Sequence, residues 1–158
     1  MALYITTSRK PSQLTRRFVK WLEFLLEGEA ENRGKRNIEE IAERARGKGF
    51  ARILFVYEKK GNPERLCFYE NGWLEPEVLI KGVILPKGKP DRRKLKLQRG
   101  ISVTAEDEVG REIKGLLGFE GEGGKEVRIN RERISFLSSG KEIGLVIRIS
   151  GLRTGKLA

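Results

Sequence analysis

The stretch ARILFVYEKKGNPERLCFY, residues 51–69, decides the fold of this chain. Its run Ile53-Leu54-Phe55-Val56 is too short for a separate helix and is rich in β-branched and aromatic side chains, which is typical of a buried strand. Residues 59–63 contain Gly and Pro and predict a turn. Residues 66–69 are again apolar and aromatic. The stretch therefore predicts two strands joined by a turn.

Upstream of this stretch, the sequence predicts one strand and two helices. Residues 2–7 have the composition of a short strand. Pro11 or Ser12 can open a helix in which apolar residues recur three or four apart up to Leu25, with arginines and a lysine on another face. Asn37 with Glu40 resembles a capping box, so a second helix of about three turns should begin there. The N-terminal half is therefore expected to mix strands and helices.

Downstream, a basic segment with two prolines separates a further strand from a second half. The expected elements are a strand at 78–85, the segment 86–99 with alternation at 94–97, a strand at 101–104, a helix at 107–117, and strands at 133–137 and 145–149. This order resembles a shortened first half. The predicted fold class is α/β, with mixed sheets, helices packed on them in one layer, and two similar halves.

The chain length fits a single domain that shares one core. We expect one domain over residues 1–158, with an N-terminal half at 1–86 and a C-terminal half at 87–158 that includes a basic linker at 87–99. No apolar run approaches the roughly 20 residues that cross a bilayer. The sequence therefore predicts a cytoplasmic protein that does not interact with membranes.

The strongest bulk property is the formal net charge of +11, which attracts polyanions such as nucleic acids. The chain contains no histidine and one cysteine, Cys67. This composition excludes a histidine general base, a Ser-His or Cys-His nucleophile pair and a Cys/His zinc set. We therefore expect no catalytic activity, no metal, no cofactor and no small-molecule substrate.

Two basic loops are the first candidate binding residues. Arg9 and Lys10 follow the first strand, and Arg33, Lys35 and Arg36 precede the second helix. Loops at strand ends and helix N-termini collect ligands, and arginine matches phosphate geometry and stacks on unpaired bases. The first helix could extend this surface with further basic residues: Arg16, Arg17 and Lys20. The alternative is a solvated rim whose charges pair with nearby acids: Glu27, Glu29 and Glu31.

A second basic strip lies in the linker. Its residues are Lys87, Lys89, Arg92, Arg93, Lys94 and Lys96. These residues could bind RNA, or they could serve solubility alone, because linkers are often charged for that reason.

One enzymatic pattern also occurs. Pro90-Asp91 followed by Glu112-Ile113-Lys114 matches the sequence motif of a magnesium-dependent nuclease core. In such a core the acidic groups converge from adjacent strands. Here Asp91 lies in a basic linker and Glu112 in a predicted helix, so the pattern is a weak match.

Three segments resemble the Brix domain: Ile5-Thr6-Thr7-Ser8-Arg9-Lys10-Pro11-Ser12, Asn32-Arg33-Gly34, and Ile53-Leu54-Phe55-Val56-Tyr57-Glu58-Lys59-Lys60-Gly61-Asn62-Pro63. They are similar to its compact archaeal members, which resemble eukaryotic proteins that accompany the small nucleolar RNP. The resemblance implies two halves, each like the anticodon-binding domain of class IIa aminoacyl-tRNA synthetases. It also implies rRNA binding without catalysis. By position, it adds three residues to the candidate RNA contacts: Ser8, Asn32 and Gly34.

These inferences together predict a non-catalytic protein of ribosome biogenesis. It would bind rRNA or pre-rRNA, assist folding, processing or assembly, and meet other assembly or RNP proteins. The alternative is a protein-binding adaptor in a ribonucleoprotein without direct RNA contact. Replacing Arg9, Lys10, Arg33 and Arg36 with Glu is expected to abolish RNA binding and leave the fold intact.

Overall fold

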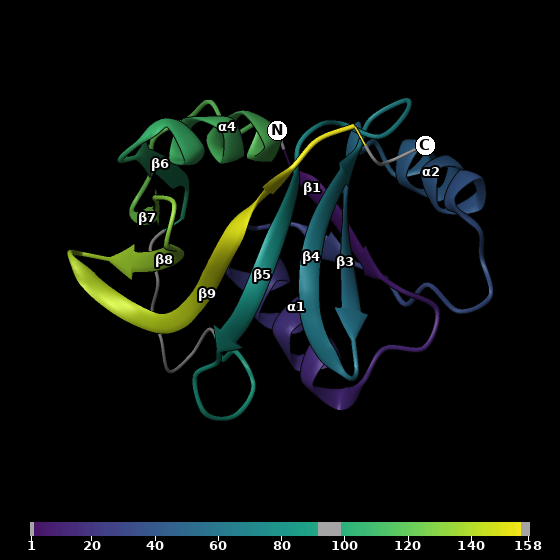
Figure 1. The fold of residues 1–158 in the computed structure, drawn as a ribbon, viewed down its shortest axis with the longest axis horizontal. Coiled ribbons are helices and arrows are strands. Elements are labelled where there is room, and N and C mark those ends of the chain that lie inside the picture. The colour runs from purple at the N-terminus through teal and green to yellow at the C-terminus, as the bar shows by residue number, and fades with distance from the viewer. Residues whose placement is uncertain (1, 92–98, 156–158) are drawn as a thin grey trace.

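The computed structural model describes residues 2–91 and 99–155, and within them one continuous mixed sheet carries three helices (Figure 1). The described strands are β1 (Leu3–Thr7), β2 (Glu29–Ala30), β3 (Arg52–Lys59), β4 (Asn62–Tyr69), β5 (Glu77–Ile84), β6 (Ile101–Ala105), β7 (Lys125–Ile129), β8 (Arg133–Ser138) and β9 (Lys141–Arg153). The helices are α1 (Gln13–Leu25), α2 (Ile38–Gly47) and α4 (Glu108–Leu117). The strand order is β2-β1-β3-β4-β5-β9-β8-β7-β6.

The helices begin where the sequence places their caps. The Ser12 side chain accepts a hydrogen bond from the Thr15 N–H at the start of α1. Asn37 and Glu40 form both bonds of a capping box at the start of α2. These side chains satisfy N–H groups that a helix leaves without partners in its first turn. Both predicted start signals are therefore confirmed.

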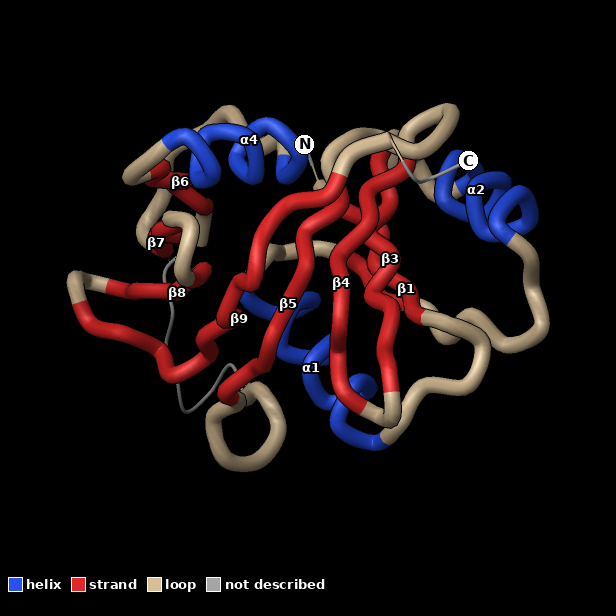
Figure 2. Tube along the Cα trace, viewed as in Figure 1, coloured by secondary structure: helices blue, strands red, loops and turns tan. Residues whose placement is uncertain are grey.

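The N-terminal half has helices on both faces of the sheet, so the expected single helical layer is wrong (Figure 2). Leu3 and Ile5 of β1 pack in the same core cluster as α1. Tyr4, between them, packs in the other cluster with Ile41 of α2. Successive strand residues point to opposite faces, so these contacts place α1 and α2 on opposite sides.

The two halves share a strand topology but form one sheet, where more than one mixed sheet was expected. In the first half β1 pairs parallel with β3, followed by antiparallel β4 and β5. In the second half β6 pairs parallel with β7, followed by antiparallel β8 and β9. The long strand β9 also pairs antiparallel with β5, which joins the halves. The likeness of each half to the anticodon-binding domain stays a prediction.

Two strands were missing from the prediction, and the ends of two others differ. The short strand β2 and the strand β7 were not predicted, and β9 extends well beyond the expected residues 145–149. The predicted turn at 59–63 is tighter, since β4 already begins at Asn62. The alternating segment expected at 94–97 lies outside the described residues.

Polar contacts reinforce the junction between the halves. The Arg52 guanidinium of β3 donates from Nη1 to the carbonyl oxygens of Gly115 and Leu116 at 2.9 and 2.8 Å. These carbonyls end α4, where a cation is favourable. At a second point, Lys125 of β7 lies 2.6 Å from the carboxylate of Glu27, which follows α1. A residue of the first half therefore caps a helix of the second, and a residue of the second half pairs with an acid of the first.

Candidate nucleic-acid interface

Side-chain hydrogen bonds to backbone carbonyl oxygens bring the two predicted basic loops together at the carboxyl end of β1. The Thr6 hydroxyl donates to the carbonyl oxygen of Glu31 at 2.8 Å. The Arg33 guanidinium reaches the Thr7 carbonyl oxygen at 3.4 Å. The expectation that residues 8–10 and 33–36 share one edge of the sheet therefore agrees with the geometry of the described residues.

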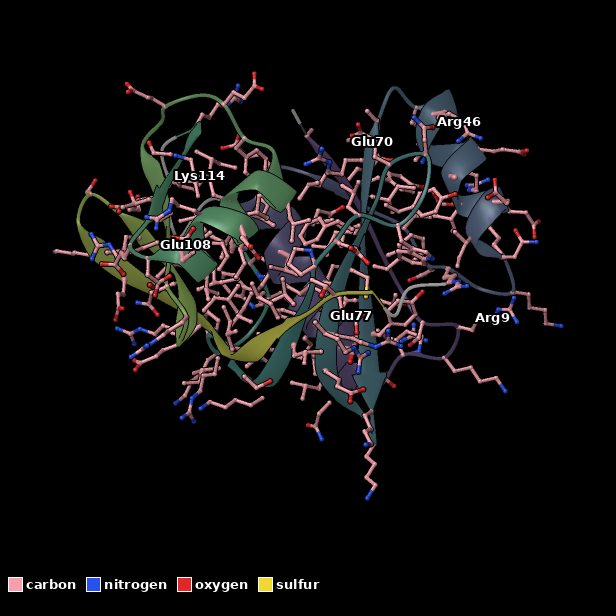
Figure 3. All side chains as sticks on the ribbon, turned by 45° about the horizontal axis from the view of Figure 1, so that its top comes forward. Arg9, Arg46, Glu70, Glu77, Glu108 and Lys114 are labelled. Atoms are coloured by element: carbon pink, nitrogen blue, oxygen red, sulfur yellow. The ribbon has the colours of Figure 1, made fainter. Side chains whose placement is uncertain are left out.

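The β3–β4 turn lies beside the same two loops. The Ser12 hydroxyl donates to the Gly61 carbonyl oxygen at 2.7 Å, which ties residues 8–12 to this turn. Since β1 and β3 run parallel, their carboxyl ends meet at one edge of the sheet. Exposed cations gather there, and we name this set the basic edge: Arg9, Lys10, Lys35, Lys59 and Lys60. Figure 3 shows Arg9 at the outer rim, on the side of the molecule away from Lys114.

The acids that could neutralise the basic edge are mostly paired with other cations. Glu29 accepts from Lys48 at 2.8 Å, and Glu31 contacts Arg44 and Lys48 of the α2 region. Of the predicted loop cations, only Arg36 reaches Glu31, at 3.7 Å. Within residues 2–91 and 99–155, no acidic side chain forms an ion pair with a residue of the basic edge. The edge therefore presents to solvent cations that have no ion-pair partner among the described residues.

Three of the predicted site residues help to hold the loop structure: Arg33, Gly34 and Ser8. Arg33 is only 8% exposed, and its Nε donates to the Arg36 carbonyl oxygen at 3.0 Å. Gly34 has φ +59°, a left-handed conformation that glycine adopts without strain. Ser8 is half-buried and continues the β1–β3 pairing through its N–H. Arg33 and Gly34 thus shape the loop, whereas Asn32 is exposed.

Glu58 anchors residues 8–12 against β3. Its Oε2 accepts from the Ser12 N–H at 3.0 Å and from the Thr15 hydroxyl. Burial alone would raise the pKa of Glu58, but these hydrogen bonds from Thr15 and Ser12 outweigh it and lower the pKa below 4.5. The carboxylate therefore fixes the start of α1 and, with it, the position of Arg9 and Lys10.

The lowered pKa of Glu58 predicts a pH dependence of stability. A group whose pKa is lower when folded stabilises the fold above its unfolded pKa, and this contribution is lost as pH falls through the folded pKa. We expect Glu58→Gln to lose stability less steeply than the wild type below about pH 4.5. Denaturant unfolding at neutral and acid pH measures this. Glu64→Gln on neighbouring β4 is the matched control, and equal slopes for all three proteins would contradict the role of Glu58.

The described part of the second basic strip lies against α1. The Arg17 guanidinium donates to the Pro86 carbonyl oxygen, and the Trp21 ring N–H donates to the Gly88 carbonyl oxygen, both at 3.3 Å. Lys87 and Lys89 are exposed on this loop. The remaining residues of the strip lie outside the described residues: Arg92, Arg93, Lys94 and Lys96.

The nuclease pattern does not assemble in the described residues. Glu112 and Lys114 are exposed on α4, on either side of the buried Ile113. Across residues 2–91 and 99–155, no group of three or more Asp, Glu, Cys or His side chains is arranged to hold a metal ion. The same residues include no helix with the length and apolar character to span a membrane.

Comparison with known proteins gives curated relatives and solved structures. No family model matches the chain. A probable Brix domain-containing ribosomal biogenesis protein of Saccharolobus solfataricus is 40% identical over 87 residues, 53% of this chain and 51% of that protein. The Archaeoglobus fulgidus protein of the same description is 43% identical over 75 residues, 47% of this chain and 45% of that protein. The chain thus spans about half the length of the curated relatives it matches.

The solved structures match over nearly the whole chain. Mil, an archaeal Imp4-like protein, superposes with a TM-score of 0.76 at 24% identity, covering 97% of this chain and 99% of its own. A probable ribosomal biogenesis protein from Aeropyrum pernix gives 0.74 at 23% identity, with 95% and 96% covered. The fold is therefore that of archaeal Imp4-like proteins. By sequence, the chain is a homologue of archaeal Brix-domain proteins, as its three motifs predict.

Proposed function

We propose that this protein is a non-catalytic factor of ribosome biogenesis that binds rRNA or pre-rRNA through the basic edge. The observation that carries the proposal is the gathering of exposed cations from three separate loops at one end of the sheet. Lysine and arginine side chains bind RNA phosphates and release the counterions that surround them. The role in ribosome biogenesis rests on the names of the relatives.

The arrangement favours shape and backbone recognition of RNA. The cations of the basic edge lie on loop ends, whereas α2 is packed on the sheet through its apolar face. A folded RNA offers phosphates at several heights, which loops of different length can meet together. The protein would thus hold the bound RNA in a fixed orientation, and it would act by position during folding, processing or assembly.

The test is binding of the purified protein to naked rRNA fragments over a range of salt concentrations. With about five phosphate contacts, affinity should fall about 10²- to 10³-fold between roughly 50 and 200 mM salt. Crosslinking and sequencing of bound RNA from native cells should then show enrichment at rRNA precursor sites.

Binding to assembled particles combined with salt-independent or absent binding to naked rRNA would contradict the proposal. That result would instead favour the adaptor role, in which the charged surface docks on a ribonucleoprotein through its proteins. Diffuse crosslinking without rRNA enrichment would contradict the link to ribosome production while leaving RNA binding in place.

A further inference from the structure

A groove of about 700 Å³ lies between α1 and the loop that follows β5. Ligand pockets have volumes of about 300–1,000 Å³, so the groove can admit a nucleotide. One wall comes from Trp21 and Phe24 of α1, whose rings meet edge to face at 6.1 Å. The opposite wall comes from Lys89 and Pro90. The loop is held in place by the hydrogen bond from the Trp21 ring N–H to Gly88.

The groove carries positive charge, and the acid that lines it, Glu23, accepts a hydrogen bond from the backbone of β2. Four cations line it: Arg16, Arg17, Lys20 and Lys89. Glu23 also lines it, but its Oε2 accepts a hydrogen bond from the Ala30 N–H at 2.6 Å. Within the described residues, no carboxylate forms an ion pair with any of the four cations. The site therefore combines cations for phosphate with an aromatic and apolar wall.

Arg16 makes this groove continuous with the basic edge. It lies in the first turn of α1, and its Nε donates to the Pro11 carbonyl oxygen in the loop that bears Arg9 and Lys10. An RNA chain that runs from the basic edge into the groove thus passes Arg16 before it reaches Lys20 and Phe24. Trp21 is 2% exposed, so Phe24 offers the accessible ring. A path of cations beside an aromatic ring is the arrangement that binds single-stranded nucleic acid, with phosphates tracked by charge and a base against the ring.

We infer that the groove between α1 and residues 86–90 binds an unpaired segment of the RNA whose phosphates lie on the basic edge. This inference rests on the proposed function and adds a distinction between paired and unpaired RNA. Lys20 and Lys89 hold the phosphates from the two walls. Phe24, which is half-buried, packs against a base together with Pro90.

The experiment compares a short blunt RNA duplex with the same duplex carrying an oligouridine overhang. The wild type should bind the overhang form about tenfold more tightly, as expected for one stacked base and its phosphate. The double variant Lys20→Glu/Lys89→Glu should lose this preference and retain binding to the blunt duplex. Lys114→Glu/Lys141→Glu is the matched control, because neither lysine lines the groove, and it should keep the preference.

Fluorescence supplies a second measurement. The chain has two tryptophans, so Trp73→Phe leaves Trp21 in the groove wall as the single emitter. The overhang form should change the Trp21 emission, and the blunt duplex should leave it unaltered. Phe24→Leu keeps an apolar side chain and should reduce the overhang preference.

The outcomes separate the two proposals. Equal binding of both RNAs by the wild type would overturn the groove inference and leave the proposed function standing. No binding of either RNA would overturn both. A Trp21 response to an oligoglutamate peptide, without one to oligouridine, would overturn the inference in favour of an acidic protein segment.

Discussion

Reversing four charges of the basic edge is expected to abolish RNA binding. The variant Arg9→Glu/Lys10→Glu/Lys59→Glu/Lys60→Glu removes exposed cations from two neighbouring loops and adds repulsion toward phosphate. Affinity for an rRNA fragment should fall more than about 100-fold near 100 mM salt, and the salt slope should become shallower by about 3 to 4. The measurement is a titration at several salt concentrations.

The control for this variant is Lys114→Glu on α4, which lies on another side of the molecule (Figure 3). Its affinity should stay within about threefold of the wild type, because no phosphate contact is lost. Both variants should unfold near the wild-type denaturant concentration, since the replaced side chains are exposed. Wild-type RNA affinity in the fourfold variant would reject the basic edge as the RNA surface.

Arg33→Ala should have the largest effect on stability among the basic residues of the two loops. The Arg33 guanidinium donates to the Arg36 and Thr7 carbonyl oxygens and lies 5.7 Å from the centre of the Phe55 ring. A hydrogen bond to a charged group contributes about 1.5–3 kcal/mol, and a cation over an aromatic ring about 0.5–2 kcal/mol. The free energy of unfolding should therefore fall by about 2–4 kcal/mol.

Denaturant unfolding measures this change, and Arg36→Ala provides the comparison. The Arg36 side chain is 37% exposed, so its removal should cost less than about 1 kcal/mol. Equal stability of the two variants would contradict the structural role of Arg33. Because Arg33 is buried, it should also be left out of charge-reversal tests of RNA binding, contrary to the sequence-based expectation that its replacement spares the fold.

Local patterns predicted all three helices of the described residues and the strand β3. The apolar spacing along α1 and the caps at Ser12 and Asn37 depend on neighbouring residues, so the sequence displays them directly. The sequence also indicated helices on both faces, because Ile53 to Val56 are four consecutive apolar residues. Four consecutive residues of β3, from Ile53 to Val56, are buried, and only a strand covered on both faces buries every residue.

The strand β7 had a short local signal, since Val127 and Ile129 alternate with Glu126 and Arg128, but nothing local indicates that Lys125 is buried. Its sequence Lys125-Glu126-Val127-Arg128-Ile129 is mostly charged, and Lys125 is nevertheless only 6% exposed. The cation is buried because Glu27, almost a hundred residues earlier, pairs with it. An ion pair between two halves leaves no local pattern to read.

Part of the candidate site could also be predicted from local sequence patterns. Arg9 and Lys10 stood out as cations beside a strand end, and they are exposed. Lys59 and Lys60 were read as part of a turn and of a family motif. The parallel pairing of β1 with β3 and the contact between Ser12 and Gly61 place them at the same edge. The contact of Trp21 with Gly88 likewise joins α1 to a loop that the sequence treats as a linker.

The pairing of β9 with β5 has a consequence for synthesis of the chain on the ribosome. Until residues 141–153 have left the exit tunnel, β5 is paired on one side by β4 and open on the other. An open strand edge recruits other strands and promotes aggregation. In the nascent chain, the edge of β5 that faces β9 is therefore open to other strands until residues 141–153 arrive.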